Sequence, residues 1–254
     1  MNEHKIVKSK MKKLQPLLED PIISRHIPKT EWYSPPILKE MLQTHSTLYV
    51  KPDIGRKGNG IIRLKALNDA KYEISYAKIT KQLLIEDALS EFQRLISHNK
   101  KYIIQQGIDL ATYEKCPFDM RLLMQKPFHT WQLTLVGGRV ATWENAVVTN
   151  VAKGARELLL EKVLQDNDQK LNAMYALREM IDLSHQIVNI LDYHFPLRII
   201  GLDMGIDKKG DIWFIEANTN PDCRLFCKVN NEKSCQKYFE AKRQIRESIK
   251  SNLN

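Results

Sequence analysis

Three oxygen-bearing side chains near the C-terminal end of the chain have the types and spacing of a metal site. Segment 201–221 reads as two apolar strands joined by the polar, glycine-containing turn 208–211. If that turn closes an antiparallel pair, Asp203 lies opposite Glu216, and Asn218 shares the face of Glu216. Two carboxylates and an amide oxygen suit Mg²⁺, which usually also binds substrate phosphates. The sequence therefore predicts a divalent metal site that serves a nucleotide.

A glycine-rich loop is the second candidate for chemistry. Segment 51–60, KPDIGRKGNG, follows a predicted strand, contains three glycines and begins with Lys51. Glycines let backbone N–H groups approach phosphate oxygens, and a lysine can neutralise the phosphate charge. No G-K-[ST] motif opens a helix here, so the segment is not a P-loop. Alone it reads more simply as a hairpin, but together with the distant carboxylates it indicates a phosphate site.

The elements that must position these residues follow from periodicity and from proline and glycine. The first 46 residues contain five prolines and predict short helices and loops. Strands are expected at 47–51, 61–65, 102–106, 120–125, 131–136 and 139–143. Helices are expected at 86–99, 171–191 and in the basic C-terminal segment 237–252. With hairpins at 131–143 and 199–218, the pattern indicates an α+β fold.

Composition bounds the class of protein. A chain of 254 residues can form one large domain or two packed lobes. No apolar run approaches the ~18 residues of a membrane span, and the charged N-terminus lacks the apolar region of a secretory signal. We therefore expect a cytoplasmic protein with no membrane partner. The formal charge of +9 favours a pocket for phosphate or acidic substrates over a nucleic-acid surface, because the lysines form no stripe.

The cysteines do not indicate a metal site of their own. Cys223, Cys227 and Cys235 lack the paired spacing and nearby histidines of a zinc site. Four cysteines in a chain of this length also do not make a disulfide framework. We expect free thiols.

The order of the motifs resembles that of ATP-grasp proteins, and more narrowly that of the YheC/YheD family of endospore coat-associated ATP-grasp proteins. The shared phrases are HIPKTEWY, YVKPDIGRKGNGI, YIIQQGIDL, FDMRLLMQK, a TN-x-x-x-G segment ending at Gly154, and GLDMGID followed by IWFIEANTNPD. Together they span about 10–222. The chain departs from the family at Ala155, where paired glycines are frequent, and at Leu202, where an acid often stands. The extra N-terminal domain of longer members has no counterpart in these residues.

The resemblance implies an ATP-grasp fold in which two α+β lobes grip a nucleotide. Segment 1–46 would lead into the fold, 47–110 would form the small lobe, and 111–254 would form the large lobe with the metal site and a C-terminal helix. The implied activity is an ATP- and Mg²⁺- (or Mn²⁺-) dependent ligase that joins a carboxylate to an amine or thiol through an acylphosphate. Its substrates are unidentified, and a connection with the endospore coat or cortex is implied. The alternative is a non-catalytic nucleotide-binding or structural spore protein.

The resemblance also assigns roles to single residues. The metal ligands would be Asp203, Glu216 and Asn218. Lys51 would contact the α- and β-phosphates of the nucleotide. Lys10 would be the earlier nucleotide-contacting lysine, with Lys12 or Lys13 as alternatives. The phosphate loop and the adenine hinge would comprise Gly55, Gly58, Asn59, Gly60, Gln105, Gln106, Gly107 and Ile108.

Three further residues, Arg121, Arg139 and Asn150, are implied to face the transferred phosphate, where a guanidinium stabilises charge. Each has a simpler reading from the residues alone. Strand alternation places Arg121 on the face of Asp119, so the two could form an ion pair. Arg139 follows a predicted Gly137-Gly138 turn and could be exposed, and Asn150 could cap the segment after it.

Overall fold

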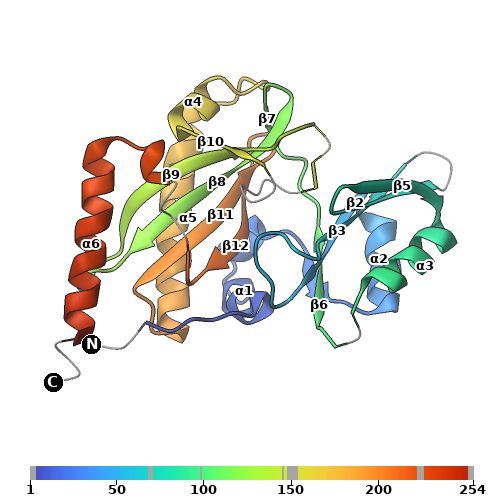
Figure 1. Cartoon of the computed structure of the whole chain (residues 1–254), viewed down its shortest axis with the longest axis horizontal. Coiled ribbons are helices and arrows are strands. Elements are labelled where there is room, and N and C mark those ends of the chain that lie inside the picture. The colour runs from blue at the N-terminus through green and yellow to red at the C-terminus, as the bar shows by residue number, and fades with distance from the viewer. Residues whose placement is uncertain are drawn as a thin grey trace.

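Two antiparallel sheets form the framework of the computed structural model, which describes residues 4–67, 71–97, 99–144, 146–147, 154–221 and 226–250. The sheets lie side by side along the longest axis of the molecule, each with its own helices (Figure 1). Along the described chain, helices are interspersed with antiparallel strands in no regular repeat. The predicted α+β fold is therefore confirmed.

The first sheet has six strands in the order β1-β6-β2-β3-β4-β5. Their bounds are Thr30–Trp32, Tyr102–Gln106, Thr47–Pro52, Ile62–Ala66, Lys71–Tyr76 and Ile79–Leu84, respectively. Helices α2 (Pro35–Thr44) and α3 (Ile85–Leu95) supply Leu38, Met41, Ala88 and Phe92 to one apolar face. Since side chains alternate along a strand, the opposite face presents Tyr49, Lys51 and Arg63 to the space between the sheets.

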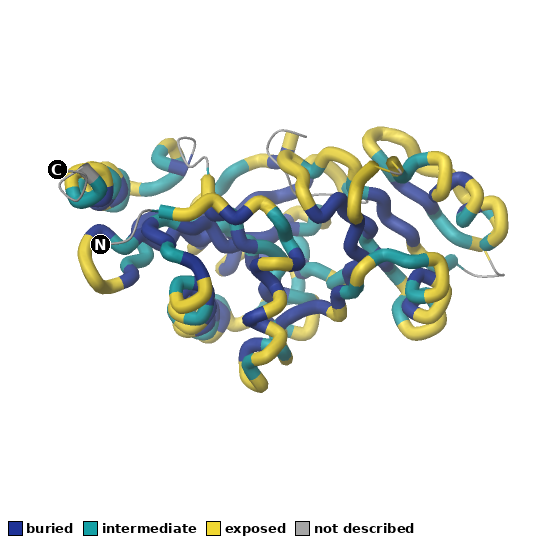
Figure 2. The backbone as a smooth tube through the Cα atoms, turned by 90° about the horizontal axis from the view of Figure 1, so that it is seen from below, coloured by how far each residue is buried: buried dark blue, intermediate teal, exposed yellow. Residues whose placement is uncertain are grey.

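The second sheet has the order β10-β9-β8-β11-β12, and a short strand β7 (Thr112–Tyr113) pairs with β8. The five strands span Arg156–Leu158, Gln132–Val140, Cys116–Gln125, Ile199–Ile206 and Ile212–Asn218. One face packs on α1 (Lys10–Leu18), α4 (Leu160–Gln165) and α5 (Ala173–His194), and the other packs on α6 (Glu232–Lys250). Most strands of both halves contain buried residues, with β5 as a largely exposed exception, and the outer sides of the helices are exposed (Figure 2).

Strand β6 belongs to both halves of the molecule. Its residues Tyr102 and Ile104 lie in the core of the first sheet, whereas Ile103 packs in the core of the second. Gln105 follows Ile103 on the same face and is buried between the sheets. Strand β6, which lies between β1 and β2, therefore forms a wall of the space between the two sheets.

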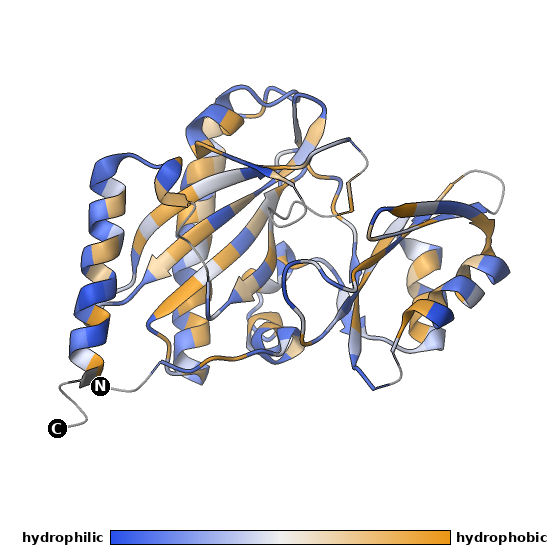
Figure 3. Cartoon of the chain, viewed as in Figure 1, coloured by the Kyte–Doolittle hydropathy of each residue, from blue (hydrophilic) through white to orange (hydrophobic). Residues whose placement is uncertain are grey.

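Local sequence explains where several helices begin. The hydroxyls of Ser9 and Ser34 and the amide oxygen of Asn172 accept hydrogen bonds from backbone N–H groups in the first turns of α1, α2 and α5. Two prolines at the start of α2 have no N–H to satisfy. Tyr238 of helix α6 packs with Leu123 and Leu135 of the sheet, and hydrophobic and hydrophilic residues alternate along the ribbon of this helix (Figure 3), as expected for a surface helix.

The glycine pair Gly137-Gly138 is not a turn, so the predicted hairpin at 131–143 is wrong. Strand β9 runs through both glycines without interruption. A Cβ atom on Gly137 would lie 2.3 Å from the Phe226 ring, and one on Gly138 would lie 2.9 Å from Val163. The pair therefore lets elements pack closely on both faces of the sheet.

Other expectations fare differently. The hairpin at 199–218 is confirmed as β11 and β12, and the strand at 102–106 is confirmed as β6. The helix expected at 86–99 ends at Leu95, and the hairpin of β4 and β5 is an element that the sequence patterns did not indicate. No helix within the described ranges is both long and apolar enough to cross a membrane. The division of the chain at residues 46 and 110 stays a prediction.

Candidate functional site

A cleft of about 600 Å³ lies between the two sheets. Its walls come from β2, β3 and β6 of the first sheet and from β8, β9, β11 and β12 of the second. Ligand pockets in proteins span roughly 300–1,000 Å³, so the cleft is large enough for a nucleotide. It brings together residues that are more than 150 positions apart, among them Lys51 and Glu216.

The predicted carboxylate pair is confirmed in its register. Asp203 of β11 and Glu216 of β12 are direct cross-strand partners, and both line the cleft. Asn218 follows two residues later on the same face, and its Oδ1 accepts a hydrogen bond from the backbone N–H of Asn220 at 3.0 Å. It lies outside the residues that line the cleft. The hairpin thus places one acid on β11 and one on the edge strand β12, with the amide of Asn218 nearby.

Asp203 of this pair also belongs to a connected network of four charged residues. Arg121 donates to both carboxylate oxygens of Asp203, with 2.9 Å between Nη2 and Oδ2. Arg139 donates to both oxygens of Asp119 at 2.6 and 2.7 Å, and its Nη2 lies 3.2 Å from Oδ1 of Asp203. Burial raises the pKa of Asp203, but Arg121 and Arg139 outweigh it and hold the pKa below its ordinary value. Asp203 is therefore a carboxylate at neutral pH.

This network corrects two simpler readings of the sequence. Arg121 pairs with Asp203 on the neighbouring strand rather than with Asp119 on its own strand. Arg139 is buried within β9 rather than exposed in a hairpin, because Asp119 lies directly across from it on β8. Asp119 lines the cleft as well, although the sequence indicated it only as an ion-pair partner of Arg121.

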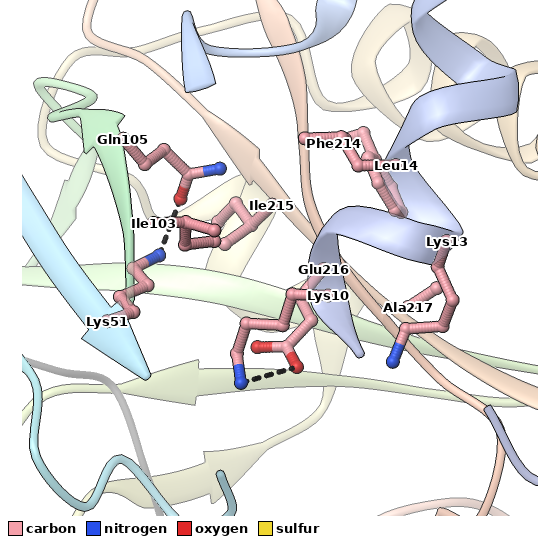
Figure 4. Close-up of a pocket in the computed structure, with 10 residues that line it drawn as sticks. All are labelled: Lys10, Lys13, Leu14, Lys51, Ile103, Gln105, Phe214, Ile215, Glu216 and Ala217. Carbon is pink, nitrogen blue, oxygen red and sulfur yellow. Dashed lines mark hydrogen bonds and ion pairs between the residues drawn. The ribbon is translucent and has the colours of Figure 1, made fainter. Parts of the chain in front are cut away.

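Three lysines line the pocket beside Glu216, Lys51 from β2 and Lys10 and Lys13 from α1 (Figure 4). Lys51 of β2 donates from Nζ to Oε1 of Gln105 at 2.5 Å, and the Nζ of Lys10 lies 3.6 Å from Oε1 of Glu216. Lys13 is buried, and its Nζ donates to the carbonyl oxygen of Val7 at 3.1 Å. Burial lowers the pKa of Lys51 to about 8, although Glu216 opposes the shift, and burial likewise lowers the pKa of Lys13.

Helix α1 holds its lysines in place through the end of β2. Oδ1 of Asp53 accepts hydrogen bonds from the backbone N–H of Met11 at 2.9 Å and from the Ser9 hydroxyl at 3.0 Å. Lys10 in turn donates to the carbonyl oxygen of Pro52 at 3.1 Å. Lys12 instead lies over the Phe195 ring, 6.0 Å from its centroid. Of the three candidate lysines, Lys10 and Lys13 face the pocket of Figure 4 and Lys12 does not.

The glycine-rich loop reaches the cleft at Gly58, which has only backbone atoms to offer. Gly58 lines the cleft, whereas Gly55, Asn59 and Gly60 lie beside it and outside its lining. Gly58 and Gly60 have φ angles of +69° and +73°, a conformation that glycine adopts without steric cost. The loop therefore needs these two glycines for its shape, whatever it binds.

The four predicted hinge residues Gln105, Gln106, Gly107 and Ile108 all line the cleft. The N–H of Gly107 donates to the carbonyl oxygen of Thr47 at 2.7 Å, and a Cβ atom on Gly107 would lie 2.6 Å from the Thr47 side chain. Only a glycine at position 107 lets the chain pass this close to Thr47 of β2 as it leaves β6. This wall combines backbone, aliphatic and amide groups, as the edge of a base would require.

Arg63 of β3 is a further cleft residue that the sequence patterns did not indicate. Its Nη2 donates to Glu73 at 2.7 Å, and its Nη1 donates to the carbonyl oxygen of Ala146 at 3.2 Å. Ala146 follows β9 of the second sheet, so Arg63 joins the two halves. The predicted residue Asn150 lies outside the described residues.

The donor set fits a divalent cation whose coordination is completed by phosphate. The described residues contain no group of three or more His, Cys, Asp or Glu side chains that could hold a metal by themselves. Asp203, Glu216 and Asn218 supply hard oxygen atoms, which suit Mg²⁺ bound through one or two carboxylates and substrate phosphates. The fit is therefore to a cation that would complete its coordination with phosphate oxygens.

Comparisons with solved structures define the class of the fold. The chain is similar to the D-cycloserine synthetase DcsG, with a TM-score of 0.56 and 12% identity over 93% of this chain and 70% of that one. It is also similar to the ATP-grasp ligase PsnB, solved in complex with a minimal precursor, with a TM-score of 0.54 and 14% identity over 93% of this chain and 60% of that one. The fold is thus an ATP-grasp fold, as predicted.

Sequence comparison then gives the family. The profile described as YheC/D like ATP-grasp matches residues 1–244, so the chain belongs to the YheC/D-like ATP-grasp family. The endospore coat-associated protein YheD of Bacillus subtilis (strain 168) is 29% identical over 85% of this chain and 49% of its own length. The endospore coat-associated protein YheC of the same strain is 25% identical over 89% of this chain and 63% of its own length. The chain therefore spans about half of one relative and less than two thirds of the other.

Proposed function

We propose that the protein is an ATP- and Mg²⁺-dependent ligase that activates a carboxylate as an acylphosphate and transfers it to an amine or a thiol. The observation that carries the proposal is the cleft itself, which is lined by Lys51 of the first sheet and by Arg139 and the carboxylates Asp203 and Glu216 of the second, with Lys10 and Lys13 of α1 beside Glu216. A triphosphate matches this distribution of charge, because buried cations without enough counter-ions favour an anion. Membership of an ATP-grasp family supports the reaction class.

In this proposal the first sheet and α1 bind the nucleotide. Gln105 to Ile108 lie against the base, and Lys51, Lys10 and the backbone around Gly58 to Gly60 contact the phosphates. Lys51 is suited to this role because it is buried and, among the described residues, its side chain contacts only neutral groups, the amide of Gln105 and the ring of Tyr49. An anionic phosphate would replace that neutral partner with a charge-assisted contact, which is stronger.

The second sheet holds the reacting end of the nucleotide. Asp203, Glu216 and Asn218 would hold Mg²⁺, which supplies neutralisation of phosphate charge and orientation when bound. Arg121 and Arg139 stabilise the phosphoryl group while a substrate carboxylate oxygen displaces ADP. An amine or thiol then attacks the acyl carbon, and inorganic phosphate and a proton leave. Positioning and charge stabilisation are sufficient for this chemistry, so no side-chain nucleophile is required.

A second function, nucleotide binding without turnover, is favoured by one observation. The two Bacillus relatives are described by their association with the endospore coat rather than by a reaction. A protein of this kind would keep the cleft and its charges. A cytoplasmic site of action with delivery to the spore fits both functions and is part of this proposal.

The release of ADP separates the two functions. The purified chain is incubated with ATP and Mg²⁺ together with amino acids, peptides or spore extract, and condensation products are sought by mass spectrometry. A ligase releases ADP and phosphate only when a carboxylate and an acceptor are present together, and Glu216→Ala removes that release. Nucleotide binding with no ADP release across broad panels would identify the binding protein instead.

A further inference from the structure

Asp203 is held by two guanidinium groups at once, although it is proposed to bind a metal. Its side chain is 16% exposed, and the side chains of Arg121 and Arg139 are 12% and 7% exposed. Arg121 contacts both carboxylate oxygens, and Arg139 approaches one of them at 3.2 Å. A cation that binds Asp203 must therefore compete with two buried cations that are already there.

The two arginines differ in what else holds them. Arg139 has its own carboxylate partner in Asp119, which it contacts through two hydrogen bonds. Within the described part of the chain Arg121 forms an ion pair with Asp203 and with no second carboxylate. Its side chain crosses Gly201, where a Cβ atom would lie 3.3 Å from the Cδ of Arg121. Arg121 can therefore move to another anion by giving up Asp203 alone. Arg139 would also have to give up its two hydrogen bonds to Asp119.

The charge around Asp203 disfavours a free metal ion. In the small pocket next to the carboxylate pair, the charged side chains of the lining are three lysines, Lys10, Lys13 and Lys51, and one carboxylate, Glu216. A dication alone would add to this excess in a largely buried region, where like charges repel strongly. A polyphosphate reverses the balance and offers Arg121 a new anionic partner.

We propose that Arg121 is an exchangeable partner, which holds Asp203 while the cleft contains no nucleotide and moves to the terminal phosphates when nucleotide binds. Exchange releases Asp203 for the metal, so a divalent cation enters together with the nucleotide and binds weakly without it. This inference rests on the proposed function for the identity of the anion. It assigns to Arg121 a positioning role toward Asp203 in addition to any role in phosphoryl transfer.

Binding of Mn²⁺, followed by the paramagnetic resonance signal of the free ion, tests the exchange. Wild type, Arg121→Gln and Arg121→Gln/Asp203→Asn are titrated with Mn²⁺, each with and without a non-hydrolysable ATP analogue. We expect Arg121→Gln to bind Mn²⁺ alone about 10-fold or more tightly than wild type, within the range usual for coupling between sites. The added Asp203→Asn change should remove that gain.

Arg156→Gln is the matched control, because Arg156 forms an exposed ion pair with Glu114 in the second sheet. It should bind Mn²⁺ as wild type does. Thermal unfolding reports whether each variant folds, and Arg121→Lys, which can reach only one oxygen at a time, should show a smaller gain in the same direction. Equal affinity of folded Arg121 variants and wild type for Mn²⁺ alone overturns the exchange. If wild type binds no nucleotide, the proposed function fails, while the comparison with Mn²⁺ alone still decides whether Arg121 blocks Asp203.

Discussion

The two walls of the cleft carry charge in opposite ways. On the first sheet Lys51 is buried beside the neutral amide of Gln105 and forms no ion pair within the described part of the chain, although the nearby Arg63 pairs with Glu73. On the second sheet Arg121, Arg139, Asp119 and Asp203 neutralise one another through charge-assisted hydrogen bonds. The first wall is ready to receive an anion, whereas the second must exchange partners before it can. The difference explains why the nucleotide is expected to bind first and the metal with it.

Removing one charged residue from the wall of the second sheet, where the charges are paired, should give the largest effect, a loss in the free energy of unfolding. Asp119→Ala leaves Arg139 buried with half of its counter-charge, and breaking a buried pair costs roughly 3–5 kcal/mol. Urea unfolding should show that loss in the free energy of unfolding. Replacing both partners, in Asp119→Leu/Arg139→Met, should restore part of it. An Asp119→Ala variant as stable as wild type would show that the pair is not the structural centre of this wall.

Removing Lys51 from the wall of the first sheet should instead leave the fold stable and weaken ligand binding. Lys51→Met relieves the cost of burying an ammonium group, so the free energy of unfolding should stay equal or rise. The affinity for ATP should fall by about 10- to 100-fold, as expected for a lost hydrogen bond to a charged group. Isothermal titration measures it, with Lys162→Met on the exposed side of α4 as control. Unchanged affinity in Lys51→Met would contradict the role of this wall.

The two walls should also differ in their response to pH. Burial lowers the pKa of Lys51 to about 8, so free Lys51 loses its proton as the pH rises above 8, and a bound phosphate raises that pKa again. Between about pH 8 and 10 binding should therefore take up a proton, and ATP affinity should fall as the pH rises. Arg139 stays charged throughout this range, because burial lowers its pKa but the carboxylates of Asp119 and Asp203 outweigh burial and raise the pKa above the ordinary value. Titrations in buffers of different ionisation enthalpy measure the proton uptake, and Lys51→Met should abolish it.

The smallest effect should come from the glycine-rich loop, where two glycines make a matched pair. Gly58 has a positive φ angle and lines the cleft, whereas a Cβ atom on Gly55 would meet only ordinary contacts at 3.5 Å or more. Gly58→Ala should weaken ATP binding several-fold, consistent with a backbone strain of about 1 kcal/mol, and Gly55→Ala should leave it within about 2-fold. Equal effects of the two changes would mean that the loop does not contact the phosphates through Gly58.

How much of this could be predicted from the sequence depends on how local each feature is. The pairing of Asp203 with Glu216 follows from one short hairpin and strand alternation, and the structure confirms it. The pairing of Arg139 with Asp119 depends on the register of two strands, which no local pattern gives. Gly137 and Gly138 resemble a turn locally, but Phe226 and Val163, distant in the chain, are the reason for them.

The missed hairpin of β4 and β5 has a local explanation. The turn between the strands contains Ala77 with a φ angle of +50°, where a glycine or asparagine is usual. Without that residue type the sequence gives no turn signal. The ATP-grasp fold was nonetheless predictable, because the motifs occur in the family's order along nearly the whole chain.

The central claim is that the cleft binds a nucleotide together with a metal held by the carboxylate pair. Titration of wild type and Glu216→Ala with ATP, each with and without Mg²⁺, tests it most directly. We expect wild type to bind ATP more tightly with Mg²⁺ than without it, and Glu216→Ala to lose that difference. If wild type binds no ATP, or if Glu216→Ala keeps the full effect of Mg²⁺, the claim is contradicted.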